Sequence, residues 1–132
     1  MSMTTSADIR QLIEAACSIR DRAYARYSNF AVGAALLAES GEIITGCNVE
    51  NASYGLTICA ERSALFTAVG MGFRKFKGIA IASPGGVPPC GACRQVLAEF
   101  CEELPVWMVD SNDISQVIET SLTRLFPGRF SF

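Results

Sequence analysis

Three cysteines lie where their thiolates could bind one metal ion. Cys90 and Cys93 form a Cys-x-x-Cys pair between a Pro-Pro turn and a predicted helix, and Cys59 opens another predicted helix. Alone, the pair also fits a redox site or two core thiols. A structural zinc site usually has four protein ligands, and the sequence holds no second Cys-x-x-Cys pair. Three thiolates leave one coordination position open, which is typical of catalytic zinc.

The predicted helix N-termini favour thiolates at these three positions. Each N-terminus carries a partial positive charge of about half an elementary unit and unpaired N–H groups. Both stabilise the thiolate and lower the cysteine pKa from its free value near about 8.5. Arg62 and Arg94 directly follow the two motifs and could offset the negative charge of three thiolates. For Arg94, a solvated surface position is an equally good interpretation.

Glu61 is the candidate proton carrier. Helix residues at i and i+2 point in different directions, so Glu61 should not bind the metal beside Cys59. It could instead lie next to the open coordination position and move protons. A glutamate that merely interacts with the helix dipole is the alternative. The three nearby cysteines favour catalysis.

The other cysteines are expected to pack in the interior. Cys17 lies on the apolar stripe of a predicted helix, Cys47 in a predicted strand, and Cys101 at a helix end. The chain contains no histidine, which excludes a Ser-His-Asp triad, a Cys-His pair and any histidine-bound metal.

Composition predicts a single globular domain spanning residues 1–132. Half of the residues are hydrophobic, the net charge is −2, and the pI is about 5.1. This balance argues against nucleic acid as the partner. The sequence has no apolar run long enough for a membrane span and no signal-like start, so we expect no membrane association and a cytoplasmic location. Cysteines there are ligands, catalysts or buried thiols rather than a disulfide framework.

Hydrophobic periodicity predicts alternating helices and strands. Ser40-Gly41 separates two strands that read as a hairpin, and Thr5 with Asp8 forms a weak capping box. The expected helices are 5–24, 58–71, 91–101 and 114–126; the expected strands are 31–39, 42–49, 77–83 and 105–110. This order indicates an α/β layered fold around one mixed sheet.

These stretches resemble the short, homotetrameric, zinc-dependent cytidine deaminases. The likeness is carried by "CAER", "PPCGACRQVLAEF", "YSNFAVGAALL", "GCNVENASYG" and the tail "LFPGRF", in that family's order. It implies a three-layer α/β/α sandwich around a roughly five-stranded mixed sheet. It also implies one zinc ion per subunit and hydrolytic deamination of cytidine and 2′-deoxycytidine in pyrimidine salvage, with release of ammonia. The implied assembly is a homotetramer with shared active sites.

The resemblance also implies roles for individual residues. The zinc ligands would be Cys59, Cys90 and Cys93, with Glu61 as proton shuttle and Arg62 hydrogen-bonding the ligand thiolates. The substrate would meet Phe30 at the pyrimidine ring, Asn48 and Glu50 at the ribose 3′-hydroxyl, the backbone near Ala60 at the base, and Tyr54 and Phe130 from a neighbouring subunit. Two positions depart from the family pattern: Arg26 stands where proline is common, and Leu125-Phe126 where two leucines are usual.

Several alternatives stay open on the sequence alone. A deaminase acting on tRNA or DNA would need basic and aromatic surfaces. A deaminase of a cytosine-containing nucleoside antibiotic would share the cysteines and Glu61. A non-enzymatic, zinc-stabilised binding module would have a closed coordination sphere. A disulfide-linked protein is the weakest alternative.

Overall fold

A five-stranded mixed sheet forms the centre of the computed structural model, which describes residues 4–132. The strand order is β2-β1-β3-β4-β5; β3 and β4 are parallel and the other neighbours antiparallel. The strands are β1 (Gly33–Ala38), β2 (Ile43–Cys47), β3 (Phe76–Ser83), β4 (Pro105–Asp110) and β5 (Asp113–Ser121). The first three residues of the predicted domain lie outside the described residues.

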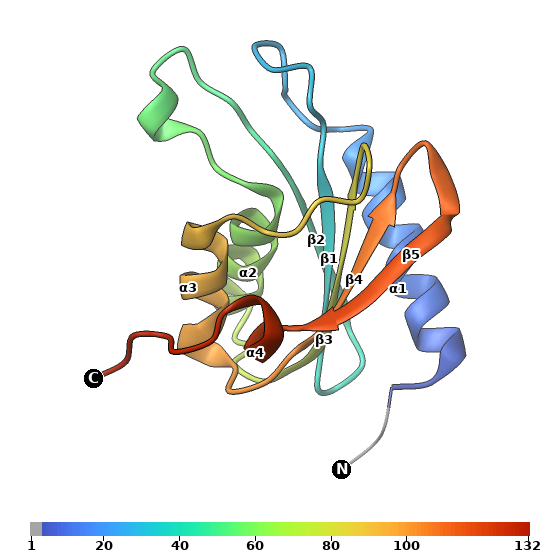
Figure 1. Cartoon of the computed structure of the whole chain (residues 1–132), viewed down its shortest axis with the longest axis vertical. Coiled ribbons are helices and arrows are strands. Elements are labelled where there is room, and N and C mark those ends of the chain that lie inside the picture. Colours follow the sequence, from blue (N-terminus) through green and yellow to red (C-terminus); the bar gives the residue numbers. More distant parts are fainter. Residues whose placement is uncertain (1–3) are drawn as a thin grey trace.

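Helices cover both faces of this sheet. Helix α1 (Ser6–Arg20) lies on one face, and α2 (Ala60–Gly70) and α3 (Gly91–Phe100) lie on the other (Figure 1). A hydrophobic cluster fills each interface, so the predicted three-layer α/β/α sandwich is confirmed. None of the helices within residues 4–132 combines the length and apolar character that a membrane span requires.

The parallel pair β3 and β4 places α3 beside α2. Parallel neighbours need a crossover connection, and α3 supplies it on the same face as α2. The apolar side chains of both helices pack in one core cluster with Leu36, Ile79 and Val106 of the sheet. The two helix N-termini are therefore held next to each other by the sheet beneath them.

The start of α1 agrees with the predicted capping box. Thr5 Oγ1 accepts from the Asp8 N–H at 3.1 Å, and the Asp8 carboxylate accepts from the Thr5 N–H at 3.1 Å. The helix ends at Arg20, four residues before the predicted end, with Asp21 as its C-cap. The other predicted helices and strands before residue 111 occur with ends shifted by two residues or fewer.

The predicted helix 114–126 is wrong. The chain forms the edge strand β5 there, followed by the short helix α4 (Leu122–Leu125). Pairing with β4 decides the outcome, because it covers an otherwise open sheet edge and lets Trp107 Nε1 donate to Glu119 Oε1 at 2.6 Å. The segment is also rich in residues that fit a pleated surface: Ile114, Val117, Ile118 and Thr120.

Gly46 allows α2 to approach β2 closely. A Cβ at this position would lie 2.3 Å from the Ala64 nitrogen and 2.8 Å from the Ala60 carbonyl oxygen. These are backbone atoms of the first turns of α2, which cannot move without displacing the helix. We therefore expect Gly46→Ala to lower the free energy of unfolding by about 1–3 kcal/mol, measured by urea denaturation.

Gly70 provides the matched control for Gly46. It ends α2, and a Cβ there would meet no atom within 4 Å. Gly70→Ala should leave stability unchanged or raise it by up to about 1 kcal/mol. Equal effects of the two substitutions would contradict the close approach of α2 and β2.

Candidate metal centre and active site

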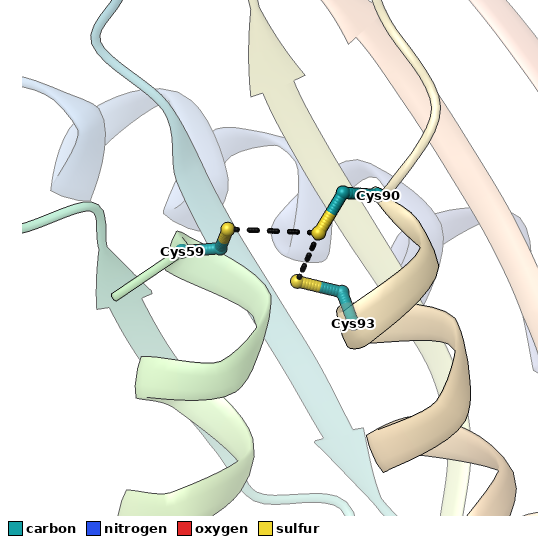
Figure 2. Close-up of side chains that lie close together, drawn as sticks. All are labelled: Cys59, Cys90 and Cys93. Atoms are coloured by element: carbon teal, nitrogen blue, oxygen red, sulfur yellow. Dashed lines mark hydrogen bonds between the residues drawn. The ribbon is translucent and has the colours of Figure 1, made fainter. Parts of the chain in front are cut away.

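The three predicted ligand cysteines meet at the N-termini of α2 and α3. Cys59 is the N-cap of α2 and Cys90 is the N-cap of α3, while Cys93 lies in the first turn of α3. Cys90 Sγ lies 3.8 Å from Cys59 Sγ and 3.5 Å from Cys93 Sγ, and all three sulfur atoms lie within 4.8 Å of one another (Figure 2). Neither N-cap thiol caps its own helix, so both point toward the shared centre.

These sulfur positions fit a zinc ion. Tetrahedral ligands at a Zn–S distance of about 2.3 Å are separated by about 3.8 Å, close to the distances observed. Thiolates are ligands that zinc favours, and the group contains three protein ligands rather than four. A three-ligand set leaves room for solvent or substrate, as in catalytic zinc sites.

Electrostatics at the centre favour a thiolate at Cys59. A hydrogen bond from Cys93, opposed by partial burial and aided by Arg62, lowers the pKa of Cys59 to about 5. The same interaction with Cys59 raises the pKa of Cys93. Arg62 Nη2 donates to Cys59 Sγ at 3.3 Å, while its buried Nε has no partner among the described residues. Arg62 thus lies where the resemblance predicts it, beside a ligand sulfur.

Glu61 lies in the first turn of α2 and is only 5% exposed. Burial raises its pKa to about 7 and outweighs the opposing effect of a backbone hydrogen bond, while the Cys59 charge adds a smaller increase. The metal-ligating group within residues 4–132 contains the three cysteines and excludes Glu61. The carboxyl group is therefore a separate, nearly desolvated group that lines the same cavity as Cys59 and Cys90 and is the candidate proton carrier.

A cavity of about 300 Å³ opens in front of the cysteines. Its size is at the lower end of the range for small-molecule sites. Two zinc-ligand candidates, the candidate proton carrier and four predicted substrate residues line it: Cys59, Cys90, Glu61, Phe30, Asn48, Glu50 and Ala60. The structure thus collects into one cavity residues that are up to 60 positions apart in the sequence.

Asn48 and Glu50 also hold the loop that carries Phe30. The buried Asn48 amide accepts from the Val32 N–H at 2.9 Å and donates to the Phe30 carbonyl at 2.8 Å. Glu50 Oε1 accepts from the N–H groups of Tyr27 at 3.0 Å and of the next residue at 3.1 Å. Both side chains therefore fix the backbone around Phe30 as well as lining the cavity.

Tyr54 and Phe130 lie outside this cavity. Tyr54 is 77% exposed in the short 3-10 helix Tyr54–Leu56, and its ring packs edge-on against Tyr27. Phe130 is 64% exposed in the C-terminal tail, where its carbonyl accepts a long hydrogen bond of 3.4 Å from Gln95 Nε2. Two large aromatic side chains are thus exposed on the surface of one chain.

Arg94 joins the metal centre to the C-terminal region. Its Nε donates to the Pro89 carbonyl at 2.8 Å, just before Cys90, and its Nη1 donates to the Leu125 carbonyl. The surface interpretation of Arg94 is therefore wrong, since the side chain is half-buried between two backbone segments. The bond to Leu125 also fixes the region of the Leu125-Phe126 departure from the family pattern.

The structure gives contacts for Ser28 and Arg26 near the cavity that could not be predicted from the sequence. Ser28 lines the cavity and donates a hydrogen bond to Glu50. The sequence indicated no role for it beyond its place in "YSNF", a stretch predicted to end a helix. Arg26, at the position where proline is common, stacks its guanidinium 5.3 Å from the centre of the Tyr27 ring. Where a proline would make the backbone of this loop rigid, Arg26 contributes a weak cation–π attraction to Tyr27 instead.

The remaining cysteines lie away from the centre. All six cysteines are free thiols, which contradicts the disulfide-linked alternative. Cys101 belongs to the core cluster beneath α2 and α3, and burial raises its pKa to about 11. Cys17 packs against the cluster beneath α1, and Cys47 is half-buried at the end of β2.

Comparison with known proteins decides the family. Residues 6–108 match the model described as the cytidine and deoxycytidylate deaminase zinc-binding region. The chain belongs to this deaminase family. The zinc cofactor follows from that match together with the cluster of Cys59, Cys90 and Cys93.

Similar proteins align with nearly the whole length of this chain. It is 50% identical over 127 residues to a cytidine deaminase from Sporosarcina psychrophila, covering 94% of this chain and 92% of the relative. It is 47% identical to a cytidine deaminase from Halalkalibacterium halodurans, covering 94% and 95%. A crystal structure of cytidine deaminase from Burkholderia pseudomallei superimposes with a TM-score of 0.87 at 48% identity, covering 92% of this chain and 98% of that one.

The ligand set of the deaminase predicts which thiols bind zinc. Cys90→Ala should remove one of three ligands and lose stoichiometric zinc, measured by elemental analysis of the purified protein. Cys17→Ala is the matched control: Cys17 belongs to α1, on the opposite face of the sheet from the metal centre (Figure 1), so this variant should retain zinc. Zinc retained without Cys90 and lost without Cys17 would overturn the ligand assignment.

Proposed function

We propose that this chain catalyses the zinc-dependent hydrolytic deamination of cytidine and 2′-deoxycytidine to uridine and 2′-deoxyuridine, with release of ammonia. The observation that carries the proposal is a buried glutamate beside three convergent cysteines at one end of a small cavity. The family match and the cytidine deaminases at about half identity support the same reaction.

Cys59, Cys90 and Cys93 would hold zinc, and Arg62 would temper the negative charge of their sulfur atoms. When bound, zinc supplies a Lewis acid that makes water a nucleophile near neutral pH. The cavity supplies the space in which the pyrimidine ring approaches the centre, with Phe30 along its wall and the Ala60 backbone at the start of α2.

Glu61 would carry every proton of the reaction. It takes one proton from the attacking water and gives it to ring N3 while the C4–O bond forms. It then moves the second proton from the new C4 hydroxyl to the amino group. The C4–N bond breaks and ammonia leaves, so water is consumed and one ammonia is produced. A buried carboxyl group suits both steps, because bulk solvent does not compete for its proton.

The cavity lining favours a free nucleoside over a nucleic acid or a nucleotide. Its polar side chains include Asn48 and Glu50, which can donate to and accept from a ribose 3′-hydroxyl. Among the described residues, no lysine or arginine lines the cavity, so it offers no partner for phosphate. The net charge of −2 agrees with this preference.

We also propose a homotetramer in which neighbouring subunits complete the active site. The exposed Tyr54 and Phe130 are the candidate contributions, since neither lines the cavity of its own chain. A cytoplasmic location remains a prediction and is supported by the free thiols, which a reducing compartment preserves.

Glu61→Gln tests the proton carrier. The amide keeps the size of the side chain but cannot accept and return protons, so kcat should fall at least about 100-fold. Zinc content should stay stoichiometric, because Glu61 is not a ligand. Ammonia release from cytidine is the assay, and a chelator added to the native enzyme should abolish it. Near-normal turnover in Glu61→Gln would contradict the proton-carrier role.

The oligomeric state tests the shared active site. Size-exclusion chromatography with light scattering should find a tetramer of the 14.2 kDa chain, about 57 kDa in total. Phe130→Ala should lower kcat/KM for cytidine while zinc content stays unchanged. A fully active monomer would contradict the shared-site proposal.

A substrate panel separates the proposal from the other deaminases. Cytidine should be turned over efficiently, and cytosine-containing oligonucleotides should not react. Faster turnover of a cytosine-containing nucleoside antibiotic than of cytidine would favour the antibiotic alternative. Tight binding of a hydrated-pyrimidine inhibitor would exclude the binding module, whose coordination sphere is closed.

A further inference from the structure

The Ser28 hydroxyl connects two parts of the cavity wall. It donates to Glu50 Oε2 in a short hydrogen bond and accepts from the Phe30 N–H at 3.0 Å. The expected ribose partner and the expected base partner are therefore joined through a single oxygen atom. Asn29, between them, adopts a left-handed conformation with φ of 56°, and its N–H donates to the Ala25 carbonyl at 2.8 Å.

The Glu50 carboxylate is hydrogen-bonded to the loop at residues 27–28 and retains capacity to accept a further hydrogen bond. Its carboxylate accepts three hydrogen bonds from Tyr27 and Ser28, and a carboxylate has about four acceptor positions. The Ser28 hydroxyl is the largest cause that lowers the Glu50 pKa, so the side chain is a charged acceptor. One acceptor position remains for a hydroxyl group in the cavity.

Ser28 is the only side-chain donor among these three bonds, because the other two donors are backbone N–H groups. The backbone donors both reach Oε1, whereas the hydroxyl reaches Oε2. Losing the hydroxyl would leave the carboxylate attached through one oxygen and free to rotate about its last bond. The loop backbone would stay anchored by Asn48 through its bonds to Phe30 and Val32.

We propose that Ser28 is a positioning residue for sugar recognition: its hydroxyl orients the Glu50 carboxylate to accept a hydrogen bond from the ribose 3′-hydroxyl. The inference rests on the proposed function. Ser28 thus determines how strongly the enzyme distinguishes nucleosides with a 3′-hydroxyl from those without one, while the chemistry at C4 remains with Glu61 and the zinc ligands.

Two nucleosides that differ only in the 3′-hydroxyl test this role. The ratio of kcat/KM for 2′-deoxycytidine to that for 2′,3′-dideoxycytidine reports the value of that hydroxyl. Ser28→Ala should lower the ratio about 10- to 100-fold, the effect of a lost hydrogen bond to a charged group. The change should come from 2′-deoxycytidine, with dideoxycytidine altered by less than about threefold.

Three variants serve as controls. Ser28→Thr keeps the hydroxyl and should restore most of the ratio. Ser40→Ala removes a similar bond, from the Ser40 hydroxyl to Glu42 Oε1 at 2.8 Å in the β1–β2 turn, and should leave the ratio unchanged. Should Ser28→Ala be insoluble, Ser28→Cys keeps the side-chain size with a weaker donor and should lower the ratio as well.

Two outcomes overturn the inference. An unchanged ratio in Ser28→Ala, or an equal loss of kcat/KM with both nucleosides, would mean that the hydroxyl serves only the structure of the loop. A zinc-loaded native enzyme that deaminates neither nucleoside would overturn the proposed function and, with it, this inference. The native enzyme alone reveals the second outcome, so the two failures are distinguishable.

Discussion

The N-termini of α2 and α3 converge on three sulfur atoms, and this interaction organises the candidate active site. Three thiolates close together repel one another, and burial makes that repulsion stronger. Before any metal binds, Cys93 keeps its proton as the hydrogen-bond donor to Cys59, and the positive end of α2 together with the Arg62 guanidinium favours the Cys59 thiolate. A divalent cation then completes the neutralisation, so zinc binding and the local fold support each other.

The sheet makes this convergence possible. The parallel pair β3 and β4 requires a crossover, which places α3 beside α2, and Arg94 ties the loop before Cys90 to α4. On the other side, Gly46 and the small residues Ala60 and Ala64 let α2 lie against β2 without an intervening side chain. The position of Glu61 thus follows from the packing of the α2 backbone against β2.

The polar side chains of Asn48 and Glu50 have two roles in the cavity wall. Asn48 and Glu50 hold the loop that carries Phe30, and they retain hydrogen-bonding capacity toward the cavity. A loop fixed in this way loses little conformational entropy when a nucleoside binds. The predicted substrate residues Phe30, Asn48 and Glu50 lie on loops, whereas the predicted proton carrier Glu61 lies on α2.

Residue types and spacing favoured a three-thiolate zinc site with Glu61 nearby, because Cys59, Cys90 and Cys93 occur in a chain without histidine, although the Cys90–Cys93 pair alone also fitted a redox site or core thiols. The sequence also determined the elements up to β4, whose periodicity is strong. It did not determine β5, because residues 114–126 fit a helix until pairing with the β4 edge is available. The bonds of Ser28 and Arg94 were likewise decided by the tertiary structure, since hydrogen bonds across 22 and 31 residues depend on where the sheet brings the chain back.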